Sequence, residues 1–161
     1  MSKSFFKKCI VAVSGRKTSI DAAMYSIMMA RTYNMQIKFV YVVDTATLKF
    51  LMNNRFLIAD EKSDFEEELT ADGKSYLAYV QNLAKAKGVH CETELLYGGV
   101  FTEIIKAAEK FEADLIIIGG GGKHSNKKTM LSREENEILV SCGCPVMVVQ
   151  KPDIEKIFKA F

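Results

Sequence analysis

The chain has 161 residues, 48% of them hydrophobic and 26% charged, with a formal net charge of +2. This length suits one domain with a real core, so we expect a single domain over residues 1–161. The small net charge gives no reason to expect binding to nucleic acid or to an anionic membrane. No signal-peptide pattern opens the sequence and no apolar stretch approaches the roughly 20 residues of a membrane span, so we expect a cytoplasmic protein.

Short apolar runs alternate with longer amphipathic segments along the chain. The apolar runs predict strands at residues 9–13, 37–43, 89–96, 114–118 and 146–149. Helical spacing of apolar residues predicts helices at residues 19–34, 63–87, 101–112 and 133–141, and a short amphipathic turn at 152–161. This alternation implies right-handed crossovers and an α/β fold, with an open, mostly parallel sheet covered by helices on both faces.

Residues 45–60 do not fit this alternation. The segment is apolar, with Leu48, Phe50 and Phe56 among its residues, but it shows no clean period. Two interpretations are open at this point. The segment is either an apolar patch that contacts a partner, or a loop that folds back over the domain's own core.

The segment 63–87 predicts the longest helix. Its apolar residues gather on one side, at Phe65, Leu69, Tyr76, Tyr79, Val80 and Leu83. Gly73 lies inside this helix, where glycine costs about 1 kcal/mol relative to alanine. Propensity alone gives no reason for a glycine at this position.

Four cysteines are present, in two different contexts. Cys9 and Cys91 lie in strand-like runs, where a thiol behaves as a small hydrophobic group. Cys142-Gly143-Cys144 has Cys-x-Cys spacing, but a zinc site needs about four ligands, and the chain has only two histidines. We therefore predict no metal site and interpret the pair as buried, reduced thiols, with a metal or redox role as the alternative.

Four glycines, at residues 119–122, follow the strand predicted at 114–118 and lead into a basic loop. In open parallel sheets, ligands bind outside the carboxyl ends of the strands, where the strand order reverses. If the first and fourth strands are neighbours, Ser14-Gly15 and the glycines face each other at that point. Glycines let backbone N–H groups approach a phosphate closely, and the next helix offers its N-terminus. The alternative is a flexible turn followed by solvated lysines.

Four segments resemble the universal stress protein family in order and spacing. They are KCIVAVSGRKTSIDAAMYSIMMAR, VYVVD, GGVFTEIIKAAEKFEADLIIIG and CPVMVV. The resemblance covers nearly the whole chain. It implies a Rossmann-like sheet of five parallel strands in the order 3-2-1-4-5, of the adenine nucleotide α-hydrolase-like type. It also implies a homodimer that pairs through the last strand.

The resemblance further implies a nucleotide site. Many members bind ATP through Gly-x2-Gly-x9-Gly-Ser/Thr after the fourth strand, and Gly119 and Gly122 match its first two glycines. Ser132 stands at the third glycine and Arg133 at the Ser or Thr position. The remaining contacts that the resemblance implies are Ala12, Ser14, Val42 and Ile118. Ser14 stands where nucleotide-binding members tend to have Asp.

The departures at the end of the motif have two physical interpretations. Ser132 adds a side chain where phosphates would approach, but this side chain is small and can donate a hydrogen bond. Ser132 and Glu135 also fit a capping box, which predicts that a helix begins at Ser132. Arg133 can contact a phosphate through a charge-assisted bond or turn outward to Glu137. Glu134 and Glu135 satisfy the helix dipole without any ligand.

Together these features predict a regulatory domain that binds ATP or a related nucleotide, with Mg²⁺ if ATP is bound. The alternative is a homodimeric stress or interaction module without nucleotide, in which residues 45–60 and the last strand contact a partner. No Ser-His-Asp or Cys-His arrangement is evident, so we expect no enzyme beyond a slow ATPase. The basic loop at 123–128 lacks aromatic residues for stacking, so we expect no nucleic acid partner, and the small net charge gives no reason to expect a membrane partner.

Overall fold

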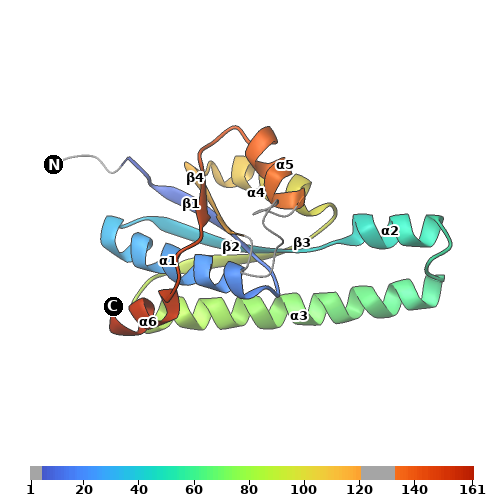
Figure 1. Ribbon diagram of the computed structural model, residues 1–161, viewed down its shortest axis with the longest axis horizontal. Helices are drawn as coiled ribbons and strands as arrows, with labels where there is room; N and C mark the ends of the chain where they lie inside the picture. Colours follow the sequence, from blue (N-terminus) through green and yellow to red (C-terminus); the bar gives the residue numbers. More distant parts are fainter. Residues whose placement is uncertain (1–4, 121–132) are drawn as a thin grey trace.

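The computed structural model describes residues 5–120 and 133–161 (Figure 1). Its strands are β1 (Lys8–Val13), β2 (Gln36–Val43), β3 (Cys91–Tyr97), β4 (Leu115–Gly119) and β5 (Val146–Val149). Its helices are α1 (Lys17–Tyr33), α2 (Thr45–Asn53), α3 (Ala59–Ala86), α4 (Val100–Phe111), α5 (Arg133–Ser141) and α6 (Ile154–Ala160). Across these described ranges no helix is both long enough and apolar enough to span a membrane.

The strands form one parallel sheet in the order β3-β2-β1-β4-β5, as predicted. Cys9 of β1 pairs with Ile37 on one side and with Leu115 on the other. The chain moves outward from β1 through β2 to β3, then crosses to the other side of β1 for β4 and β5. The strand order therefore reverses between β1 and β4, and the loops that leave these two strands share one edge of the sheet.

Alternation along each strand divides the core between the two faces of the sheet. Cys9 and Val11 face α1, α3 and α6, whereas Ile10 and Ile116 face α4 and α5 (Figure 1). Because helices cover both faces, the central strands are buried throughout, which explains their continuous apolar sequences. The tail predicted as a short turn is the helix α6, and its Ile154 is buried in the core on the α1 face.

The long helix α3 explains Gly73. A Cβ at Gly73 would lie 2.6 Å from Cδ1 of Leu95 and 2.6 Å from Cδ1 of Tyr41, so glycine lets the helix lie directly on β2 and β3. The predicted apolar side was partly wrong. The buried residues of α3 are Gly73, Leu77, Val80 and Ala84, whereas Phe65 and Tyr79 are about half exposed, at 46% and 48%.

Residues 45–70 form a helical arm that consists of α2, a turn and the first part of α3. Figure 1 shows α2 and this part of α3 running antiparallel, beyond the end of the sheet. Asp44 caps α2, since its Oδ1 accepts a hydrogen bond from Thr47 N at 3.0 Å and its Oδ2 one from Thr47 Oγ1 at 2.6 Å. Neither interpretation of residues 45–60 predicted a helix, and α3 also begins four residues before the predicted start.

The arm leaves large apolar side chains in solvent. Within α2 only Leu48 is buried. The large apolar side chains of the arm that are exposed are Phe50 (61% of its surface exposed), Phe56 (72%), Ile58 (64%) and Phe65 (46%). A loop folded over the domain's own core is therefore wrong for this segment, whereas contact with a partner stays a prediction.

Candidate functional site

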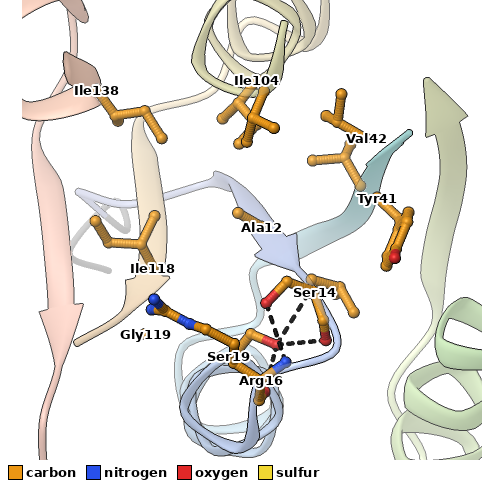
Figure 2. Close-up of a pocket in the computed structure, with 13 residues that line it drawn as sticks. Ala12, Ser14, Arg16, Ser19, Tyr41, Val42, Ile104, Ile118, Gly119 and Ile138 are labelled. Atoms are coloured by element: carbon orange, nitrogen blue, oxygen red, sulfur yellow. Dashed lines mark hydrogen bonds between the residues drawn. The ribbon is translucent and has the colours of Figure 1, made fainter. Parts of the chain in front are cut away.

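A cavity of about 240 Å³ opens at the carboxyl edge of the sheet, between the ends of β1 and β4. Its walls are mostly apolar side chains from the face that α4 and α5 cover, namely Ala12, Val40, Val42, Val100, Ile104, Ile118 and Ile138. Figure 2 shows Ile104 and Ile138 pointing from the two helices toward Ala12 and Ile118 on the strands. The cavity lies where the strand order reverses, which is the usual place for a ligand in such a sheet.

The rim of the cavity is the turn from β1 into α1, and Ser19 holds this turn together. Ser19 is buried, and its Oγ accepts a hydrogen bond from Ser14 N at 2.9 Å. The same hydroxyl lies 2.8 Å from the carbonyl oxygen of Ser14 and 2.9 Å from that of Arg16 (Figure 2). Ser14 Oγ accepts from Arg16 N at 3.3 Å. These bonds fix the first turn of α1, with its positive dipole end, beside the cavity.

Arg16 adds a cation to this rim. Figure 2 shows its side chain extending toward Gly119 at the end of β4. Among the described residues that line the cavity, Arg16 is the only one with a full charge at neutral pH. A guanidinium presents paired N–H donors that suit phosphate and carboxylate groups. The sequence prediction did not include Arg16 among the site residues, although a cation three residues after the first strand was the available signal.

Gly119 has a structural requirement of its own. A Cβ at this position would lie 2.3 Å from the carbonyl oxygen of Thr18 and 2.8 Å from Ser19 N, which are both backbone atoms. The end of β4 therefore packs directly against the first turn of α1, and only glycine fits there. This packing alone explains why residue 119 is glycine, without any phosphate nearby. Gly119 is therefore weaker evidence for a nucleotide site than the sequence motif suggests.

The structure brings most of the predicted site residues together. Ala12, Ser14, Val42, Ile118 and Gly119 all line the cavity. Gly122 and Ser132 lie outside the described residues, as does the start of the predicted capping box. Arg133 is the first residue of α5, but its side chain lies outside what the structure describes. Both predicted contacts of Arg133, with a phosphate or with Glu137, therefore stay predictions.

The sequence prediction did not include several residues of the cavity wall. The spacing of apolar residues along the helices was the signal that could have found them. Ile104 and Ile138 are 3% and 1% exposed and come from the apolar sides of α4 and α5. Within the described lining there is no His, Cys, Asp or Glu. The described part of the cavity therefore offers apolar contacts, hydroxyls and one guanidinium, but no general base.

The sequence and the fold both have known relatives. A model of the universal stress protein family matches residues 5–150. A universal stress protein of Methanocaldococcus jannaschii is 30% identical over 156 residues, covering 95% of this chain and 87% of the relative. The family match spans the sheet, the described cavity lining and the whole arm.

Solved structures show the same fold. A universal stress family protein from Burkholderia pseudomallei superposes with a TM-score of 0.72 at 22% identity, covering 93% of this chain and 100% of the other. A family protein from Arabidopsis thaliana with bound AMP has a TM-score of 0.63 at 17% identity, covering 92% and 94%. A universal stress protein from Archaeoglobus fulgidus has been solved in complex with dAMP, and another universal stress protein in complex with cAMP. With a family match over nearly its whole length, this chain belongs to the universal stress protein family.

Proposed function

We propose that this chain is a regulatory domain that binds an adenine nucleotide in the cavity between β1 and β4. The observation that carries the proposal is the pairing of an apolar cavity with a cationic rim at the point where the strand order reverses. Relatives of the same fold have been solved with AMP, dAMP and cAMP, which supports the same ligand class.

Each part of the cavity suits one part of a nucleotide. Ala12, Val42 and Ile118 form an apolar surface of the kind on which a purine base packs. Ser14 and Arg16 lie on the rim, where a ribose or phosphate has polar partners. Gly119, Gly122, Ser132 and Arg133 keep the phosphate-contact role that the family motif implies.

ATP is the nucleotide we propose first, with Mg²⁺ as its companion ion. The described lining holds no carboxylate, so the protein itself supplies no evident magnesium ligand there. Mg²⁺ is commonly held by substrate phosphates and water with few protein ligands, so this lining is compatible with the ion. We propose a regulatory role; the described lining contains no His, Cys, Asp or Glu that would act as a general base.

Nucleotide binding can be tested directly on the purified full chain. We expect denaturation to release an adenine nucleotide, or calorimetric titration with ATP and Mg²⁺, and with AMP, to show saturable binding at one site. The variant Arg16→Glu should weaken binding by about 10-fold or more, because it reverses a charge on the rim. Lys49→Glu on the arm makes the same charge change away from the cavity and should leave binding unchanged. No released nucleotide and no heat at millimolar ligand would refute the proposal.

A second proposal concerns homodimerisation through β5. Val146–Val149 is an apolar edge strand of the described sheet, and edge strands readily pair with another chain. We propose that two copies associate there and expect sedimentation to detect a dimer. Met147→Lys should shift the equilibrium toward monomer, whereas Phe56→Ser on the arm should not. A monomer at every accessible concentration would contradict this proposal.

A further inference from the structure

Cys142 and Cys144 lie at the amino ends of the strands, whereas the nucleotide cavity lies at their carboxyl ends. They flank Gly143 in the turn that joins the end of α5 to the start of β5. Both are half-buried and reduced, and both line a separate pocket of about 160 Å³ against α4. The nucleotide proposal makes no use of this pair.

The turn that holds the two thiols is fixed at both ends. Cys142 N donates to the carbonyl oxygen of Ile138 at 3.0 Å, which continues the hydrogen bonding of α5 by one residue. Ile116 N donates to the carbonyl oxygen of Pro145 at 3.0 Å, which joins the turn to the start of β4. Within the turn, Cys142 Sγ lies 3.0 Å from the carbonyl oxygen of Cys144. The turn therefore holds both thiols at the wall of one pocket before any metal arrives.

The charges around the two thiols favour a cation. The carboxylate of Asp114 is close enough to Cys144 to act on its thiol electrostatically. Glu109 and Glu112 lie at the rim of the same pocket, and the negative end of the α5 dipole points toward the turn. A reactive, nucleophilic cysteine needs the opposite surroundings, with positive charge nearby.

We propose that Cys142 and Cys144 together bind one soft monovalent cation of the Cu(I) type through their two sulphur atoms. Soft thiolate ligands select Cu(I), and two such ligands are enough for that ion. Zinc is a poorer match, because structural zinc sites take four ligands and the described residues contain no group of three or more His, Cys, Asp or Glu that could hold a metal. The cation replaces the two thiol protons, which leave to solvent, so no electron is transferred.

Competition titration of the reduced full chain tests this proposal under anaerobic conditions. Cu(I) is supplied as its complex with a coloured chelator, bathocuproine disulfonate, and transfer to the protein is followed by loss of colour. We expect one equivalent to bind, and both Cys142→Ser and Cys144→Ser to weaken binding by about 100-fold or more, since each removes one of two ligands. Cys91→Ser is the matched control, because Cys91 is also half-buried but lies in β3, and it should bind as the wild type does.

A second measurement needs no variant. Cu(I) should protect Cys142 and Cys144, but not Cys91, from iodoacetamide, as read by mass spectrometry of the digested protein. Binding that survives in both serine variants, equal protection of Cys91, or no transfer of Cu(I) from the chelator would overturn the proposal.

Discussion

The cavity between β1 and β4 and the arm of residues 45–70 are both rich in apolar side chains, but these side chains have different surroundings. In the cavity, apolar residues come from strands and helices whose other neighbours are already packed, so Ile104 and Ile138 are nearly fully buried. In the arm, α2 and the first part of α3 extend past the sheet (Figure 1), and Phe50 and Phe56 are 61% and 72% exposed. The same kind of residue is therefore held rigidly in one region and left available in the other.

Backbone packing makes the same contrast sharper. At Gly119 the end of β4 meets backbone atoms of α1, which cannot move without displacing the whole first turn. At the tip of the arm, the apolar side chains face solvent. We therefore expect substitutions near the cavity to change the free energy of unfolding strongly, and substitutions on the arm to change mainly what the surface binds.

The largest effect is expected for Gly119→Ala. The new Cβ would meet the carbonyl oxygen of Thr18 at 2.3 Å, so the strand or the helix must shift, at a cost of about 3 kcal/mol or more of unfolding free energy. Urea unfolding measures this loss. Gly143→Ala is the matched control, because a Cβ there meets nothing within 4 Å, and it should change stability little. Equal stability of the two variants would show that the β4–α1 contact is looser than the structure has it.

A smaller effect, but one of unexpected sign, is expected for Gly73→Ala. Helix propensity alone predicts a gain of about 1 kcal/mol, whereas the clash with Tyr41 and Leu95 predicts a loss of about 1–3 kcal/mol, which should dominate. Glu67→Gly, in the arm part of the same helix, tests propensity without packing and should cost about 1 kcal/mol. If Gly73→Ala stabilises the protein, the helix does not rest on β2 and β3 as closely as described.

The sequence predicted the sheet well, because strand alternation depends on local pattern and the strand order came from the family resemblance. The arm was missed for a physical reason. Asp44 was interpreted as the end of a strand, and a capping side chain is not distinguishable from a turn residue by type alone. The periodicity of α3 was visible, but it could not show that half of the helix leaves the sheet, so Phe65 was grouped with core residues. Arg16 was missed because most loop cations are simply solvated.

A pH-dependent effect is expected on the sheet side, at Asp114. Its Oδ2 accepts hydrogen bonds from Lys7 N at 2.8 Å and Lys8 N at 3.0 Å, and these bonds hold the pKa of the carboxylate below its usual value. A lowered folded-state pKa stabilises the fold above the unfolded-state pKa, and this contribution disappears as the pH falls through the folded-state pKa. Asp114→Asn should therefore lower stability at pH 7 and lose its effect in strong acid.

Urea unfolding of both proteins at pH 7 and near pH 2 checks this expectation. The carboxylate is at the surface, so the change should be small. Glu66→Gln removes a carboxylate from the arm and is the comparison. A stability difference between Asp114→Asn and wild type that grows toward low pH would have the wrong sign for this hydrogen-bonded carboxylate.

The smallest effect on stability is expected for Phe56→Ser at the tip of the arm. The side chain is 72% exposed, so its loss should change the unfolding free energy by no more than about 0.5 kcal/mol. Val80→Ser, at a fully buried position further along α3 where the helix packs on the sheet, should cost several times more, because it places a hydroxyl in the core and leaves a cavity. A loss at Phe56 as large as that at Val80 would mean that the arm is covered in solution. If that loss also depended on protein concentration, the covering surface would be a second copy of this chain, and the two regions would then differ only in whether their apolar side chains pack within one chain or between two.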